Sequence, residues 1–124
     1  MGKTYAYDLS ERLLRFSVDV IKMLGNIERR RELDVVKYQL SKSVTSIGAN
    51  YQESQSSTRK EFSSRVRICV REALETRYWI RILLALGLAE EEKIKAAHQE
   101  SEEIIKILKT ILRKSSADDF RGSQ

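Results

Sequence analysis

Hydrophobic residues recur every three or four positions through almost the whole chain, and no proline interrupts the pattern. This spacing places the hydrophobic side chains on one face of an α-helix, whereas a half-buried strand would alternate at every second residue. Because proline ends or kinks a helix, its absence from 124 residues is compatible with long, uninterrupted helices. The sequence therefore predicts an all-α protein, and no strand pattern competes with that prediction.

Four segments carry the helical pattern, and we expect helices at about residues 5–27, 32–54, 59–86 and 90–114. Thr58 and Glu61 have the spacing of a helix capping box, and Gly87 tolerates the left-handed backbone that follows a helix. Short connections between amphipathic helices favour an antiparallel up-and-down four-helix bundle, formed by residues 1–114 as a single domain. Residues 115–124 are polar, and we expect them to form a disordered tail.

The composition says more about the cellular compartment of the protein than about its function. The 23 Lys and Arg residues exceed the 18 Asp and Glu residues, so the net charge of +5 permits an anionic partner without identifying one. The lone cysteine, Cys69, excludes a disulfide within the chain and is typical of a reducing compartment. No apolar run is long enough to cross a bilayer or to act as a signal peptide. We therefore expect a cytoplasmic protein that does not contact a membrane.

Constellations of residues for catalysis or metal binding are missing. His98 is the only histidine, and Lys95 stands where the glutamate of a di-iron Glu-x-x-His motif would be. Cys69 falls on the hydrophobic face of its helix, so we interpret it as a small core residue. There is no glycine-rich loop for a phosphate. We therefore expect no enzymatic activity, no metal and no cofactor.

Small and polar residues form a stripe along the second predicted helix, at the edge of its hydrophobic face. A glycine inside a helix costs about 1 kcal/mol relative to alanine, so Gly48 indicates the close approach of another backbone or a bulky side chain. The stripe is compatible with a packing seam within the bundle, a subunit interface or a ligand pocket. Ser43 and Asn50 are its candidates for an interface. The stripe consists of Gln39, Ser43, Ser46, Asn50 and Glu53, with Gly48 and Ala49 among them.

Basic residues follow one face of the third predicted helix. With Arg67 at 0° on a helical wheel, Lys60, Arg71 and Arg81 lie within about 40° of it, and Arg77 lies about 80° away. Residues 59–87 contain seven basic and three acidic residues, so much of the positive charge lies on this helix. Guanidinium groups at this spacing favour contacts with successive phosphates. The alternative is a solvated face that forms ion pairs with neighbouring carboxylates, those of Glu72, Glu75 and the acidic fourth helix.

The third helix also carries hydrophobic residues away from its main hydrophobic stripe. They are Ile68, Trp79 and Leu83, with Tyr78 adjacent to Trp79. A bundle helix needs only one buried stripe, so this second one predicts a subunit interface in which Trp and Tyr act as anchors. In the alternative interpretation, Trp79 closes the end of the hydrophobic core.

Two motifs of this chain resemble those of a known family. Ser43-x-x-Ser46-Ile47-Gly48-Ala49-Asn50 followed by Glu53, and Glu72-Ala73-x-Glu75-Thr76-Arg77-Tyr78-Trp79, are similar to the signatures of four-helix bundle proteins encoded in 23S rRNA intervening sequences. Tyr51 and Gln52 depart from the family pattern, which has smaller or aliphatic residues there. The resemblance covers nearly the whole chain and implies an up-and-down bundle. It implies no catalytic residues.

The resemblance also implies partners. The family is similar in fold to an accessory protein of diversity-generating retroelements, which forms a pentameric barrel, binds nucleic acid through basic surfaces and assists a reverse transcriptase. By analogy, we expect a ring-like homopentamer that acts on RNA or DNA, with a polymerase or another protein as a further partner.

Together, these observations predict a non-enzymatic homo-oligomer that binds structured RNA or DNA. The residues expected to contact the nucleic acid are Lys60, Arg67, Arg71, Arg77 and Arg81. The residues expected at the oligomer interface are Ser43, Asn50, Ile68, Tyr78, Trp79 and Leu83. The alternative function is a homo-oligomeric protein-interaction scaffold without direct nucleic-acid binding, in which the arginines form salt bridges between subunits.

Overall fold

A computed structural model of the chain describes residues 5–122, and the side chains of residues 8–116. Within this range the chain forms four α-helices, and no strand occurs there. They are α1 (Tyr5–Gly25), α2 (Asp34–Ser54), α3 (Arg59–Ala85) and α4 (Glu91–Gly122), with a short 3-10 helix, η1 (Arg31–Leu33), before α2. The prediction of an all-α chain with four helices is confirmed.

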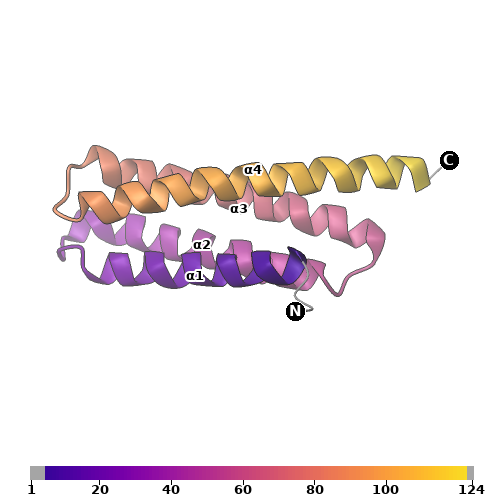
Figure 1. The fold of residues 1–124 in the computed structure, drawn as a ribbon. Coiled ribbons are helices and arrows are strands. Elements are labelled where there is room, and N and C mark those ends of the chain that lie inside the picture. The colour runs from indigo at the N-terminus through magenta and orange to yellow at the C-terminus, as the bar shows by residue number, and fades with distance from the viewer. Residues whose placement is uncertain (1–4, 123–124) are drawn as a thin grey trace.

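The four helices lie along one common axis, and successive helices run in opposite directions (Figure 1). α3 packs closely against both α2 and α4, and α1 packs against α2. Of the helix pairs that are in contact, α1 and α4 pack least closely, and α4 extends well beyond the N-terminal end of α1 (Figure 1). This is the antiparallel up-and-down order that the sequence predicts.

The core is built from the hydrophobic faces that the sequence pattern defines. Each helix contributes large aliphatic side chains that are at most 1% exposed, and burying one such side chain stabilises the fold by about 1.5–3 kcal/mol. These contacts hold the four helices together. Those residues include Leu13, Val20, Leu40, Val44, Ile47, Val66, Ile80, Leu83, Ile94, Ile104 and Leu108.

The predicted helix boundaries around α3 are confirmed by hydrogen bonds. The Thr58 hydroxyl accepts the backbone N–H of Glu61 at 3.2 Å and donates to Glu61 Oε1 at 2.6 Å. The side-chain hydrogen bond from Thr58, together with its backbone N–H, lowers the pKa of the Glu61 carboxyl below its ordinary value. At the other end, Gly87 adopts φ of 64°, which a glycine tolerates without strain, and its N–H donates to the Leu84 carbonyl at 3.2 Å.

The C-terminal end of α4 differs from the expectation. The backbone of residues 115–122 continues the helix, so the prediction of a disordered tail is wrong for these residues, and residues 123–124 lie outside the described range. The antiparallel arrangement accounts for the beginning of this extension, since the first turns of α3 lie beside residues 111–115 of α4. The Ser63 hydroxyl donates to Ser115 Oγ at 3.1 Å, and Ile111 and Leu112 pack against the core.

Candidate nucleic-acid interface

Four cations lie on the solvent-exposed face of α3, opposite the core. Lys60, Arg67, Arg71 and Arg81 are exposed, and none of them forms an ion pair with another described residue. We call these four residues the basic face. At about 1.5 Å per residue, Arg67 and Arg81 are roughly 21 Å apart along the helix. The basic face is therefore a row of charges along the outside of the bundle.

Arg77 does not belong to the basic face, although the sequence places it there. Its Nη1 lies 3.3 Å and 3.4 Å from the two carboxylate oxygens of Glu102 on α4, and both side chains are half-buried. His98 Nε2 lies 3.6 Å from the same Glu102 carboxylate. Arg77 therefore joins α3 to α4, because about 80° of rotation from Arg67 brings it to the side of α3 that contacts α4.

Other arginines also join helices. Arg12 on α1 makes a bidentate contact with Glu100 on α4, with both N···O distances at 2.7 Å. Arg65 on α3 lies 2.8 Å from Glu53 Oε2 on α2. These two arginines are half-buried against their partners, whereas the arginines of the basic face are not held by any described carboxylate. The arginines that join helices thus differ from those of the basic face, which are exposed and have no carboxylate partner among the described residues.

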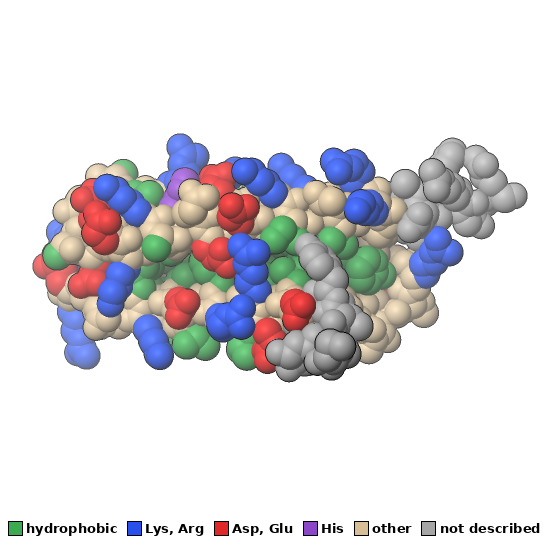
Figure 2. Space-filling view, viewed as in Figure 1, with side chains coloured by type: hydrophobic (Ala, Val, Ile, Leu, Met, Phe, Trp, Pro, Cys, Tyr) green, Lys and Arg blue, Asp and Glu red, His purple; other side chains and the backbone are tan. Residues whose placement is uncertain are grey.

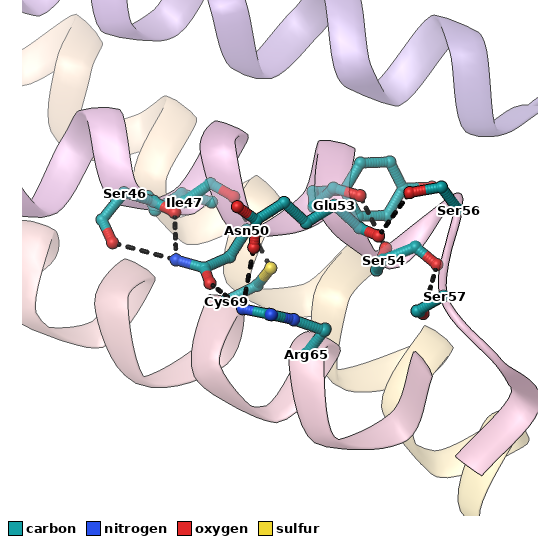
Figure 3. Close-up of polar contacts among 10 residues, drawn as sticks. Ser46, Ile47, Asn50, Glu53, Ser54, Ser56, Ser57, Arg65 and Cys69 are labelled. Atoms are coloured by element: carbon teal, nitrogen blue, oxygen red, sulfur yellow. Dashed lines mark hydrogen bonds and ion pairs between the residues drawn. The ribbon is translucent and has the colours of Figure 1, made fainter. Parts of the chain in front are cut away.

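Figure 3 shows how Arg65 reaches from α3 to the stripe of small and polar residues on α2. Its Nη1 donates to Asn50 Oδ1 at 3.4 Å, and the Asn50 amide donates to the Ser46 carbonyl at 2.9 Å. Sequence reasoning missed Arg65. The available signal was position, since Asn50 and Glu53 lie near the end of α2 and Arg65 lies near the start of α3, and a short connection between antiparallel helices brings these turns close together.

Ser43 and Gly48 of the stripe also pack inside the bundle. The Thr76 hydroxyl on α3 donates to Ser43 Oγ at 2.8 Å, and the Ser43 hydroxyl donates to the Leu40 carbonyl at 3.3 Å. Thr76 and Ser43 are 0% and 1% exposed, so this pair is sealed from water. At Gly48, an added Cβ would lie 3.5 Å from Leu13 Cβ on α1, an ordinary contact distance. Of the three interpretations, the structure supports a packing seam within one chain.

The predicted oligomer interface is corrected at two positions. Ser43 and Leu83 are 1% and 0% exposed in the single chain, so their side chains contact their own bundle and are not available to a second copy. Asn50 is occupied by Ser46 and Arg65 within the α2–α3 seam. The physical reason is that Ser43 and Asn50 face α3 of the same chain and Leu83 lies in the core, which a helical wheel of one helix does not reveal.

The remaining interface candidates are partly accessible. Ile68 and Trp79 are half-buried, and Trp79 packs against the core, as expected for a residue that closes its edge. The indole N–H of Trp79 donates to Glu75 Oε1 at 3.3 Å. Tyr78 is 56% exposed and contacts Trp79 edge to face, with ring centroids 5.3 Å apart. Tyr78 is therefore the most open of the predicted interface residues.

A second exposed hydrophobic surface lies on α1. Leu14, Val18 and Ile21 are 57%, 40% and 46% exposed, and their spacing of four and three residues places them on one side of the helix. We call them the apolar ridge of α1. Figure 2 shows hydrophobic side chains along the lower edge of the molecule, where α1 lies. Sequence reasoning missed this ridge because it concentrated on the hydrophobic positions of α3.

A hollow of about 460 Å³ separates α1 from α4, where the two helices pack least closely. Hydrophobic side chains, among them Phe16, Val20 and Met23, line it, and hydrophobic atoms are visible between the two helices in Figure 2. The Arg12–Glu100 ion pair lies at its rim. No serine, cysteine or histidine lines the hollow, so its described residues offer no nucleophile or base of those types.

The single cysteine of the chain is buried. Cys69 is 0% exposed, and burial raises the pKa of its thiol to about 12, which disfavours the nucleophilic thiolate at neutral pH. Among the residues that the structure describes, no group of three or more His, Cys, Asp or Glu is arranged to hold a metal ion. In the same part of the chain, every helix is too short or too polar to span a membrane.

Comparison with known proteins identifies similar sequences and structures. Residues 7–110 match the family model of the 23S rRNA-intervening sequence protein. A crystal structure of a protein of unknown function from the S23 ribosomal protein family of Bacteroides thetaiotaomicron is 31% identical to this chain, with a TM-score of 0.72. The similarity covers 83% of this chain and 96% of that protein. None of the curated proteins matches this chain.

Proposed function

Because this chain belongs to the family of 23S rRNA-intervening sequence proteins, we propose that it is a non-enzymatic, homo-oligomeric bundle that binds structured RNA or DNA. The residues that contact the nucleic acid in this proposal are those of the basic face, Lys60, Arg67, Arg71 and Arg81. Arg77 is left out because Glu102 already neutralises it. The family is named after an intervening sequence of 23S rRNA, and the name does not state that its members bind RNA. Direct binding is therefore proposed from the basic face of this chain.

One contrast among the arginines carries the proposal. Arg12, Arg65 and Arg77 each lie within 3.3 Å of a carboxylate oxygen on a neighbouring helix. The arginines of the basic face have no such partner among the described residues, so they remain available to an anion from outside. A guanidinium group binds phosphate through two parallel N–H donors, and a row of them follows a phosphate backbone without reading its sequence.

Oligomerisation strengthens this binding in the proposal. One basic face of four cations makes few phosphate contacts, but several copies around a ring act together on one RNA molecule. We propose that the apolar ridge of α1 contributes to the contact between subunits, since exposed hydrophobic stripes mark protein–protein surfaces. A ring of five subunits is expected only by analogy with the accessory protein of diversity-generating retroelements, which forms a pentameric barrel. A location in the cytoplasm is part of the same proposal.

Charge reversal tests the basic face directly. The variant Arg67→Glu/Arg71→Glu removes two cations from the basic face and adds two anions, so binding of a fluorescent structured RNA should fall more than tenfold at low salt. The control is Arg29→Glu/Arg31→Glu, which makes the same change in net charge at exposed positions between α1 and α2. Equal losses in the two variants would show that net charge matters and the basic face does not.

The exposed hydrophobic surface of α1 favours a second candidate, a homo-oligomeric scaffold that binds another protein. In that case the arginines form salt bridges between subunits, and Arg67→Glu/Arg71→Glu dissociates the oligomer. Native mass measured on the same samples separates the two functions. A variant that stays assembled and loses RNA supports the nucleic-acid proposal, and a variant that falls apart supports the scaffold.

A further inference from the structure

An exposed tyrosine lies among the arginines of the basic face. Tyr78 follows Arg71 by seven residues and precedes Arg81 by three, and both spacings place residues on the same side of a helix. Measured along the helix axis, its Cα is about 10 Å from that of Arg71 and about 4.5 Å from that of Arg81. At 56% exposure, more than half of the Tyr78 side chain is open to a ligand held by these arginines.

The neighbouring tryptophan supports the Tyr78 ring. The two rings meet edge to face, with centroids 5.3 Å apart and planes inclined at 72°. Trp79 is itself fixed, because it packs against the core and its indole N–H donates to Glu75 at 3.3 Å. Tyr78 is therefore an aromatic ring that rests on a half-buried neighbour while remaining exposed. Such a ring loses little conformational freedom when a ligand binds it.

We propose that Tyr78 is a stacking platform for an unpaired base, and that the basic face therefore binds single-stranded segments in preference to duplex. This inference rests on the proposed function, since it names the class of nucleic acid that the same face recognises. Aromatic side chains inside a cationic groove are the general means of binding single strands, because every base offers a flat surface for stacking. In a duplex the bases are already stacked and paired, so Tyr78 has no base to contact.

The charges around Tyr78 disfavour its role as a subunit anchor. A second copy docked on this ring would bring its own surface against Arg71 and Arg81, and a symmetric contact would place like charges opposite one another. A nucleic acid meets the same arginines with phosphates of the opposite sign. The electrostatics of the basic face thus favour an anionic ligand with flat, unpaired rings.

The test compares three probes of the same length by fluorescence anisotropy; because the duplex carries about twice the negative charge, tighter binding of the single strand cannot be a charge effect. They are an unstructured single-stranded RNA, the duplex of that RNA with its complement, and an abasic oligonucleotide that retains the phosphates without the bases. The wild-type protein should bind the single strand most tightly. Tyr78→Ala should weaken that binding by about 5- to 150-fold, and Tyr78→Phe, which keeps the ring, should remain close to wild type.

The remaining measurements separate a stacking role from a structural one. Tyr78→Ala should bind the abasic probe as the wild type does, with an unchanged salt dependence, because its phosphate contacts are intact. Trp79 is the only tryptophan, so its emission provides a second signal that should change when the single strand binds. Native mass and circular dichroism should be unchanged in Tyr78→Ala, since this exposed side chain is not part of the core.

Three outcomes would overturn the inference while leaving the proposed function in place. They are undiminished binding of the single strand by Tyr78→Ala, equal affinity of the wild type for single strand and duplex, and an equal loss of affinity for the abasic probe. A lower native mass of Tyr78→Ala would also overturn it, because Tyr78 would then hold subunits together. If no probe binds the wild type at low salt, the proposed function itself fails.

Discussion

The buried Ser43–Thr76 hydrogen bond offers a sharp test of the packing seam between α2 and α3. Ser43→Ala leaves the Thr76 hydroxyl, which is 0% exposed, without its acceptor at 2.8 Å. An unsatisfied buried donor costs about 1–3 kcal/mol. Thr76→Val keeps the shape of the side chain and removes the donor, so it should cost about 0.5–1.5 kcal/mol, the net contribution of one hydrogen bond.

The double variant Ser43→Ala/Thr76→Val should be more stable than the sum of the two single changes predicts. Once both partners are apolar, no buried hydroxyl is left unsatisfied, so we expect a coupling free energy of about 1 kcal/mol or more. Urea unfolding followed by circular dichroism, at one fixed subunit concentration, measures each free energy.

The matched control for this double-mutant cycle is Thr45→Val, on α2 like Ser43. The Thr45 hydroxyl is exposed and bonds only to carbonyls of its own helix, at 2.8 Å to Ser41 and 3.1 Å to Lys42. This change should therefore alter the free energy of unfolding by less than about 0.5 kcal/mol. If Ser43→Ala and Thr76→Val instead add to within about 0.3 kcal/mol, the two hydroxyls do not interact and the described seam is wrong.

Three further predictions concern single positions. Gly48→Ala should stabilise the protein by up to about 1 kcal/mol in the same assay, since the added methyl finds Leu13 at 3.5 Å; destabilisation would mean that α1 lies closer. Gly87→Ala should cost about 1 kcal/mol because φ of 64° strains any residue with a side chain, and an unchanged midpoint would argue against this helix end. Cys69 should resist a thiol reagent in the folded state, since burial raises its pKa from 9.0 to about 12. The unfolded thiol ionises above about pH 9 and the folded one does not, so stability should fall with rising pH, by at most about 1.4 kcal/mol per pH unit. This fall in stability with rising pH should be missing from Cys69→Ala. An equal pH dependence of stability in the wild type and Cys69→Ala would contradict the raised pKa of Cys69.

Local signals in the sequence predicted the helices well. The Thr58–Glu61 pair and Gly87 define the ends of α3 through hydrogen bonds and backbone angles that involve only neighbouring residues. The buried faces were also predictable, because periodicity alone decides which side of a helix avoids water. The end of α4 was not, since its helical conformation up to Gly122 is accompanied by contacts such as Ser63–Ser115 that join residues far apart in the chain.

The roles of the arginines could be predicted only in part. A helical wheel orders Arg65, Arg67 and Arg77 by angle, but it does not say which helix lies beside each angle. The structure supplies that information: Arg65 faces Glu53 on α2, Arg77 faces Glu102 on α4, and Arg67 faces solvent. The same limit explains why Ser43 and Leu83 were assigned to an interface, although both are buried within one chain.

The unpaired arginines of α3 are the basis of the functional proposal, and the salt dependence of RNA binding tests it most directly. The measurement is the affinity of the wild-type protein for one structured RNA across a salt series, with native mass recorded on the same samples. If each subunit makes about two phosphate contacts, several engaged subunits should give a steep slope of log K against log salt, near −0.7 to −0.9 per contact. A slope close to zero, or no binding at low salt by an assembled oligomer, would contradict the proposal and point to a protein partner.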